Sequence, residues 1–142
     1  MKLKIIGETD DKFLIIIRFL VGFVFLSEGI QKLLFPEVRG LGRFEDIGLP
    51  AAEFLAYFVA SFEIACGTLV LLGVYTRIAV IPLITIMLVA IATTKIPILV
   101  DKGFWAMAHA ARTDLSMLLC SIFLLVRGSG YFSIDRKCTR IE

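Results

Sequence analysis

The sequence predicts an all-α integral membrane protein in which four apolar helices form a bundle across the bilayer. Hydrophobic residues make up 58% of the 142 residues, and the mean hydropathy is +0.90. Soluble domains are about half apolar. Four apolar stretches recur along the chain, and a helix needs about 20 such residues to cross the hydrocarbon core. The length is that of one domain, so we expect a single transmembrane domain over residues 1–142.

The first expected span covers residues 13–34. Lysines before it superficially resemble the start of a signal peptide, but acidic residues interrupt this region and Arg18 interrupts the apolar run. No small-x-small cleavage site follows before Glu28, so we expect the span to be retained. Phe35 and Pro36 end it, and the glycine-rich residues 36–50 are expected to form a polar loop.

The second and third expected spans cover residues 52–74 and 78–94. Only residues 75–77 separate them, which predicts an antiparallel hairpin. Pro82 lies one turn into the third span, where neighbouring helices can satisfy the freed carbonyl. Lys95 and Pro97 are expected to end this span.

The fourth expected span covers residues 106–127. Its continuous apolar part, Leu115 to Val126, has 12 residues and would not cross the bilayer alone. The Ala-rich, helix-favouring residues 106–114 supply the missing length and draw His109, Arg112 and Asp114 towards the membrane. The alternative is a short helix that dips into one leaflet. Residues 129–142 are expected to be a polar tail in the aqueous phase.

Four spans place both termini on one side of the membrane. That side would carry eight basic residues against six on the other, which favours cytoplasmic termini in the cell (inner) membrane. The eight are Lys2, Lys4, Lys12, Arg77, Arg127, Arg136, Lys137 and Arg140, and the six are Lys32, Arg39, Arg43, Lys95, Lys102 and Arg112.

Charged residues inside the first span share one helix face with two glycines. The spacing alternates between four and three residues along Arg18, Gly22, Phe25, Gly29 and Lys32. Small residues on such a face allow a second helix to approach closely. Glu28 precedes Lys32 by four residues and can pair with it along the helix.

The second span carries Glu63 near its centre, on a face with Ala56, Ala60 and Gly67. A carboxylate at that depth must be paired or protonated, because a lone charge in the bilayer is costly. One interpretation is a proton-binding or ligand-binding group. The other is a buried ion pair with Arg18 or Lys32 that fixes the register of the helices.

The fourth span carries a polar stripe made of His109, Arg112 or Thr113, Ser116 and Cys120. Asp114 points elsewhere, because residues two apart on a helix do not face each other, and Lys32 or Lys95 is its expected partner. The order of the spans gathers six ionisable residues in one leaflet: Glu28, Lys32, Lys95, His109, Arg112 and Asp114.

Composition and motifs argue against several classes of protein. The net charge of +2 and the lack of a long basic run do not indicate nucleic acid binding. The three cysteines are far apart and form no CxxC motif. His109 is the only histidine, so one protomer cannot hold a haem between two histidines. No metal site and no cofactor motif is expected from these residues.

An ordered set of short motifs resembles the DoxX family of small bacterial and archaeal membrane proteins. The resemblance extends from about Phe13 to Asp135. The motifs, in order, are Arg18-Phe-Leu-Val-Gly22, Gly29-Ile-Gln-Lys32, Gly48-Leu-Pro50, Glu63 with Gly67 and Gly73 before Arg77, Arg112-Thr-Asp114-Leu, and Leu-Leu-Val-Arg-Gly128 leading to Tyr131-Phe-Ser-Ile-Asp135.

The resemblance implies a four-helix membrane bundle and a redox context. Some members of the family are associated with thiosulfate-to-quinone electron transfer, and others with oxidative-stress complexes beside redox proteins. We therefore expect a non-catalytic subunit, or a bundle that binds a small ligand, associated with a membrane redox system. The alternative is a quinone-linked oxidoreductase subunit, in which Glu63, Lys32 or His109 would handle protons at a bound quinone.

The candidate ligand-binding or proton-handling residues are Arg18, Glu28, Lys32, Glu63, Lys95, His109, Arg112 and Asp114. The expected partners are the lipid bilayer and a redox protein subunit. The glycine and alanine faces also permit a homodimer. No feature of the sequence assigns a substrate.

Overall fold

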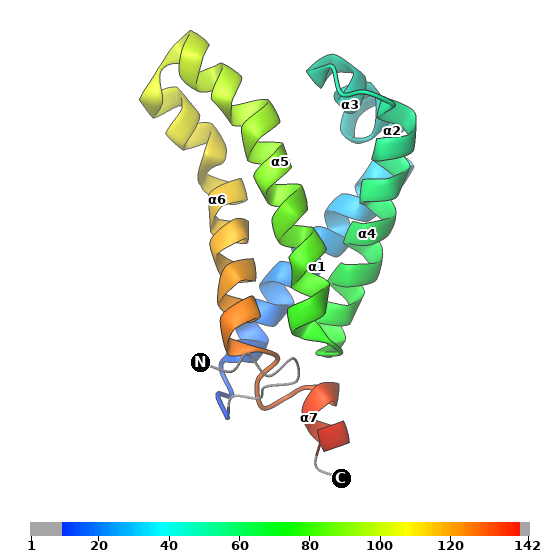
Figure 1. Cartoon of the computed structure of the whole chain (residues 1–142), viewed down its shortest axis with the longest axis vertical. Coiled ribbons are helices and arrows are strands. Elements are labelled where there is room, and N and C mark those ends of the chain that lie inside the picture. Colours follow the sequence, from blue (N-terminus) through cyan, green and yellow to red (C-terminus); the bar gives the residue numbers. More distant parts are fainter. Residues whose placement is uncertain (1–9, 140–142) are drawn as a thin grey trace.

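The computed structural model describes residues 10–139, and these residues contain helices and no strand (Figure 1). The helices are α1 (Leu14–Leu34), α2 (Pro36–Arg39), α3 (Leu41–Ile47), α4 (Ala52–Leu72), α5 (Thr76–Lys102), α6 (Phe104–Arg127) and α7 (Ile134–Thr139). Among the described residues, α1, α4, α5 and α6 are long and apolar enough to cross a membrane. A helix of 21 residues, the length of α1 and α4, is about 32 Å long, which matches the hydrocarbon core. The predicted fold class is confirmed.

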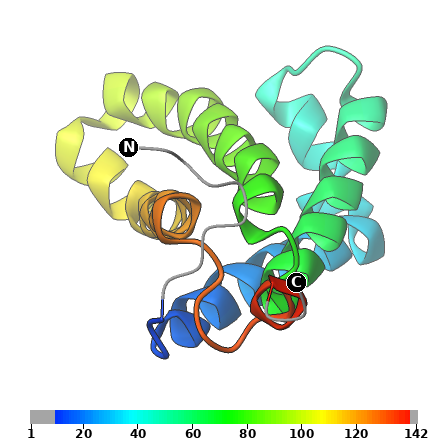
Figure 2. The same cartoon turned by 60° about the horizontal axis from the view of Figure 1, so that its bottom comes forward.

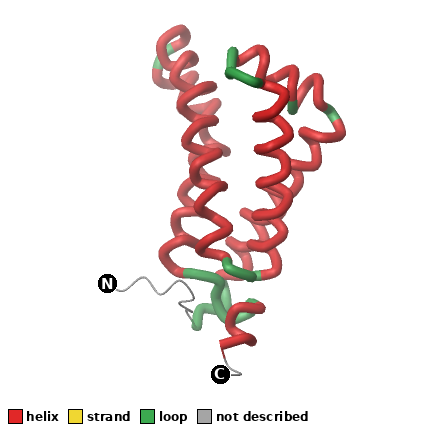
Figure 3. The backbone as a smooth tube through the Cα atoms, turned by 45° about the vertical axis from the view of Figure 1, so that its right-hand side comes forward, coloured by secondary structure: helices red, strands yellow, loops and turns green. Residues whose placement is uncertain are grey.

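The four long helices form two pairs, α1 with α4 and α5 with α6. Figures 1 and 3 show the pairs meeting where α4 turns into α5 and diverging towards the opposite end. The short helices α2 and α3 lie at the diverging end, which we call the α2–α3 end. Figure 2 views the molecule from the other end, where α1 begins, α6 finishes and α7 lies. We call it the α7 end.

Small residues let α1 and α4 pack closely. A Cβ atom at Gly29 would lie 2.9 Å from the Ala60 carbonyl oxygen, and one at Gly67 would lie 2.8 Å from the Leu26 nitrogen. Both glycines are buried in this contact, which confirms the predicted small-residue faces. The two faces pack against each other within one chain, so they are not free to pair two copies of it.

Helix α5 is longer than predicted. It continues through Pro97 to Lys102, so the expectation that Lys95 and Pro97 end this span is wrong. A proline removes one backbone donor, but the following residues Ile98 to Lys102 remain helical and Gly103 donates to the Leu99 carbonyl oxygen. The extension places Lys95 within the helix and not at its end.

The connection over residues 36–50 is also more ordered than predicted. It contains α2 and α3 in place of a polar loop. Pro36 occupies the first turn of α2, where its missing N–H has no cost, and Gly48 ends α3 in a left-handed conformation with φ of 78°. Glycine and proline here mark the boundaries of helices.

Helix α6 begins at Phe104, so the Ala-rich residues do extend the fourth span upstream. The alternative, a short helix in one leaflet, does not fit a helix of 24 residues. Asp114 thus lies in the N-terminal half of α6, where its side chain can contact side chains of α5.

Arg18 is a structural residue at the α7 end. Its guanidinium donates to the carbonyl oxygens of Val70 (3.0 Å), Leu71 (2.9 Å), Ser129 (2.8 Å) and Phe132 (2.6 Å). These acceptors belong to the last turn of α4 and to the segment after α6. Arg18 therefore ties three parts of the chain together and is only 3% exposed.

The described part of the tail lies outside the spans, but it is folded against them. Ser129 and Ser133 are buried. The Asp135 carboxylate accepts hydrogen bonds from the backbone N–H groups of Tyr75 (2.9 Å) and Thr76 (3.4 Å), at the start of α5. An acidic side chain suits a helix N-terminus, so the tail supplies the cap that α5 lacks locally. Residues 140–142, and Lys2 and Lys4 at the other terminus, lie outside the described residues.

Candidate functional site

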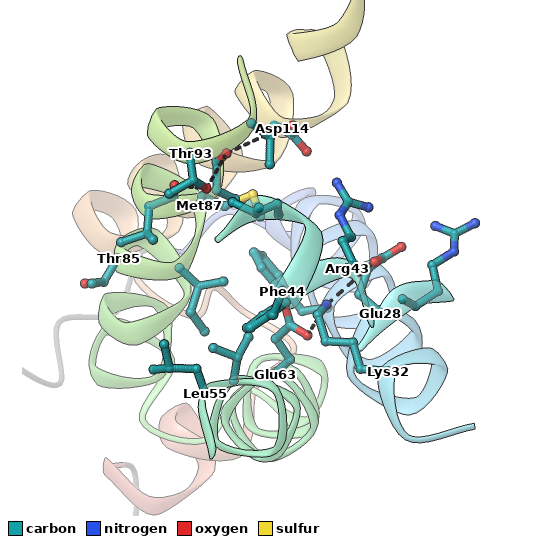
Figure 4. Close-up of a pocket in the computed structure, with 18 of the residues that line it drawn as sticks. Glu28, Lys32, Arg43, Phe44, Leu55, Glu63, Thr85, Met87, Thr93 and Asp114 are labelled. Atoms are coloured by element: carbon teal, nitrogen blue, oxygen red, sulfur yellow. Dashed lines mark hydrogen bonds and ion pairs between the residues drawn. The ribbon is translucent and has the colours of Figure 1, made fainter. Parts of the chain in front are cut away.

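A cavity of about 490 Å³ lies between the two helix pairs, towards the α2–α3 end (Figure 4). Its walls are mostly apolar and include Phe25, Phe58, Val59, Ile86 and Met117. The ionisable side chains that line it are Glu28, Lys32, Arg39, Arg43, Glu63 and Asp114. Its volume is within the range of small-molecule sites, which is about 300–1,000 Å³.

An ion pair between α1 and α4 lies at the inner side of this cavity. The Lys32 Nζ donates to the Glu63 Oε2 at 2.7 Å, and it lies 3.8 Å from the Glu28 Oε2 (Figure 4). The Lys32 and Glu63 side chains are 11% and 3% exposed. Of the two partners predicted for Glu63, the structure selects Lys32, because Arg18 is engaged at the other end of α1.

Gly29 explains why Lys32 and Glu63 meet. A Cβ atom at Gly29 would lie 3.0 Å from the Glu63 Cβ and 2.8 Å from the Ile64 Cγ1. A larger residue at this position would push α4 away from α1. The glycine thus sets the helix separation at which the lysine spans the interface.

Asp114 lies on the opposite wall of the cavity. Its Oδ2 is 2.9 Å from the Lys95 Nζ, and the Lys95 side chain is 12% exposed. This ion pair joins α6 to α5. Of the two partners expected for Asp114, the structure therefore shows Lys95 and not Lys32. Thr93 and Thr94, which also line this wall, donate their hydroxyl hydrogens to carbonyl oxygens of α5 itself.

Two lining residues, Arg39 and Arg43, were not among the predicted site residues. They belong to α2 and α3, which were expected to be a loop. Their side chains line the cavity and form no ion pair with the described residues. The only sequence feature that could have indicated them is that two basic residues lie four apart, which is a weak signal because Gly40 lies between them.

Four of the eight predicted site residues do not line the cavity. Lys95 reaches it only through its ion pair with Asp114, and the other three lie away from it. Arg18 binds backbone carbonyls at the α7 end. His109 and Arg112 are exposed on the outer face of α6 and hydrogen-bond to each other, with 3.0 Å from the Arg112 Nη1 to the His109 carbonyl oxygen. The polar stripe predicted for this helix therefore faces outward at His109, Arg112 and Ser116, because Met117 and Leu118 supply the buried face.

The arrangement can bind a molecule that has both apolar and polar parts. Apolar walls bury an apolar group, and the Lys32 ammonium, the Glu63 carboxylate and the two arginines offer donors and acceptors at defined positions. Residues 10–139 contain no group of three or more His, Cys, Asp or Glu side chains placed to hold a metal ion.

Comparison with known proteins places this architecture in a family. The model of the DoxX family matches residues 13–96, which is more than half of the chain. The chain is a member of the DoxX family. The match covers α1 to α4 and most of α5, and it therefore includes both partners of the Lys32–Glu63 pair.

Two relatives of this DoxX protein are informative. It is 56% identical over 132 residues to an uncharacterized membrane protein of Mycobacterium tuberculosis, covering 89% of this chain and 81% of the relative. It is 32% identical over 124 residues to a Bacillus subtilis protein named "Putative oxidoreductase CatD", covering 85% of this chain and 83% of the relative. No solved structure matches the chain significantly.

Proposed function

We propose that this DoxX protein is a non-catalytic membrane subunit that binds a small amphipathic molecule in its cavity and works beside a membrane redox system. The observation that carries the proposal is the cavity itself. Apolar walls from the four long helices surround a nearly buried ion pair, Lys32–Glu63. Ionisable residues in membrane-spanning helices commonly face a partner or a cavity. A ligand with a polar head and an apolar body matches both features.

The bilayer is a direct source for such a ligand. Phe58 on α4 and Val89 on α5 both line the cavity, and they are 48% and 49% exposed. The cavity therefore reaches the lipid-facing surface between these helices. An amphipathic molecule can enter from the bilayer sideways without crossing the aqueous phase.

The redox context rests on the relatives and on no group seen in the chain. The Bacillus subtilis relative has the name "Putative oxidoreductase CatD", and the family resemblance implies an association with redox complexes. A subunit that binds and presents a small molecule from the membrane suits such a complex. We assign the chemistry to a partner subunit.

The second candidate function is a quinone-linked oxidoreductase subunit. The residues of the cavity fit a quinone, because the Lys32 ammonium can donate to a carbonyl oxygen and the walls suit an apolar tail. When bound, a quinone would supply a two-electron acceptor. Glu63 would then hold or release a proton at Oε2, and His109, which is exposed on the outer face of α6, would have no part in it.

For the orientation, we propose that the α7 end faces the cytoplasm of the cell (inner) membrane. The support is the excess of basic residues in the sequence on this side, eight against six. The cavity would then lie in the outer leaflet.

A matched pair of variants tests whether the cavity binds a ligand. Ala90 lines the cavity, whereas Ala92 on the same helix is exposed and does not. An Ala90→Trp side chain would project into the cavity and occupy part of it, and Ala92→Trp would add the same bulk on the lipid-facing side. Both proteins are purified in a mild detergent, and the small molecules that co-purify are extracted and identified by mass spectrometry.

We expect one or more molecules to co-purify with the wild type and with Ala92→Trp. The same molecules should be absent from Ala90→Trp. A benzoquinone or naphthoquinone among them would favour the second candidate function. If the wild type and Ala90→Trp retain the same molecules in the same amounts, the cavity is not a ligand site.

A further inference from the structure

The segment from Pro36 to Ile47, which covers the α2–α3 end of the cavity, separates its charges. Both of its basic residues, Arg39 and Arg43, line the cavity. Its three acidic residues do not line it: Glu37, Glu45 and Asp46. Arg39 and Arg43 are exposed, as the acidic residues are, so they lie at the opening of the cavity. Of the charged residues on this segment, only the basic ones therefore line the cavity.

The acidic residues of the cavity already have basic partners within the chain. Asp114 is paired with Lys95, and Lys32 serves both Glu63 and Glu28. Arg39 and Arg43 have no ion pair among the described residues. With Lys95 included, four basic groups face three acidic ones, and the two basic groups without a partner are both at the α2–α3 end.

An unpaired guanidinium at the mouth of an apolar cavity favours one kind of ligand. Low-dielectric walls strengthen the field of a charge at the opening. Arginine binds carboxylate and phosphate groups through two parallel N–H donors. A neutral ligand has no group that would use both donors and the positive charge. Figure 4 shows Arg43 on the same side of the cavity as Lys32 and Glu28, with Asp114 across from them.

We propose that the ligand is an amphipathic anion, with a carboxylate or phosphate headgroup held by Arg39 and Arg43 and an apolar tail between α4 and α5. Phe58 and Val89 line the tail's path to the bilayer. This inference rests on the proposed function, because it names the class of molecule that the cavity takes. It makes the α2–α3 segment the recognition element of the protein.

The test compares probes that differ only in headgroup charge. The probes are oleate against methyl oleate, and phosphatidylglycerol against phosphatidylcholine with the same chains. Equilibrium binding is measured on the purified full-length protein in uncharged dodecyl maltoside micelles. The charge variant is Arg39→Gln with Arg43→Gln. Its matched control is Lys102→Gln with Arg112→Gln, which removes two exposed positive charges from the same end outside the cavity.

The wild type and the control should bind at least one anionic probe about tenfold more tightly than its neutral counterpart, and the charge variant should lose this preference. Preference within the oleate pair alone indicates a free fatty acid, and preference within the phospholipid pair indicates a lipid headgroup. Equal binding of charged and neutral probes overturns the inference, as does a preference that survives in the charge variant.

Failure of this inference can be told apart from failure of the proposed function. If methyl oleate binds as tightly as oleate and Ala90→Trp abolishes both, the cavity is a ligand site without a preference for anions. If no probe binds in a way that Ala90→Trp affects, both proposals fall.

Discussion

Lys32 on α1 donates a hydrogen bond to Glu63 on α4, with 2.7 Å between Nζ and Oε2, inside a membrane-spanning bundle. Both side chains are nearly buried, and the pair forms part of the wall of the cavity. The same two residues therefore serve the packing of two helices and the polarity of the candidate site. Separating these roles requires variants that remove the charge and the hydrogen bond independently.

Lys32→Met should destabilise the protein by about 3 kcal/mol, because it leaves the Glu63 carboxylate buried without a cation. Glu63→Gln should cost about 1 kcal/mol, since the amide oxygen still accepts from Lys32. The double variant Lys32→Met with Glu63→Leu should recover part of the loss. The measurement is unfolding in detergent micelles. If Lys32→Met is no less stable than an exposed control such as Lys102→Met, the pair does not hold the helices.

Arg18→Lys should lower the stability by about 2 kcal/mol or more, although it keeps the charge. The planar guanidinium reaches carbonyl oxygens on two segments at once, at Val70 and at Ser129, and a single ammonium cannot span them. The melting temperature in detergent is the measurement, with Arg112→Lys on the exposed face of α6 as the control. Equal melting temperatures for the two variants would show that the carbonyl contacts contribute little.

Gly29→Ala should destabilise the bundle even though alanine favours a helix by about 1 kcal/mol over glycine. The added methyl group would lie 2.9 Å from the Ala60 carbonyl oxygen and 3.0 Å from the Glu63 Cβ, so α1 and α4 must separate. Thermal unfolding measures the effect, and Ile30→Ala on the exposed side of α1 is the control. A Gly29→Ala protein more stable than the wild type would mean that the helices are not in close contact.

Cys138 offers a natural reporter of orientation. It is exposed on α7, whereas Cys66 is buried. If the α7 end is cytoplasmic, a membrane-impermeant maleimide should label Cys138 only after the cells are permeabilised. Lys102→Cys in a Cys138→Ser background should be labelled in intact cells. The reverse pattern would place the α7 end outside.

Apolar length was sufficient to predict three of the four spans, because a bilayer requires about 20 apolar residues in each crossing helix. The upstream part of α6 followed from the need for length together with helix propensity. The end of α5 was placed too early because Pro97 reads as a terminator, yet a proline costs one backbone hydrogen bond and the helix resumes after it. The helices of the 36–50 segment were missed for a similar reason, since Pro36 starts α2.

The candidate site was predicted only in part. Helix periodicity placed Lys32 and Glu63 on faces rich in small residues and left Arg18 or Lys32 as the partner of Glu63. The structure pairs Glu63 with Lys32. Periodicity could not tell an inward face from an outward one on α6, so His109 and Arg112 were grouped with residues that lie elsewhere. Arg39 and Arg43 line the cavity because the short segment that carries them folds over its end. The pattern of residues within one helix cannot predict how such a segment folds.

Photo-labelling shows directly whether the cavity takes an amphipathic anion. The protein in lipid nanodiscs is labelled with a diazirine-bearing oleate, and the adducts are mapped by mass spectrometry. We expect adducts on cavity residues such as Val59, Thr93 and Met117. Unlabelled oleate should compete with their formation, and Ala90→Trp should abolish them. Adducts confined to lipid-facing residues such as Phe19 and Leu119, unchanged by competitor and by Ala90→Trp, would contradict this expectation.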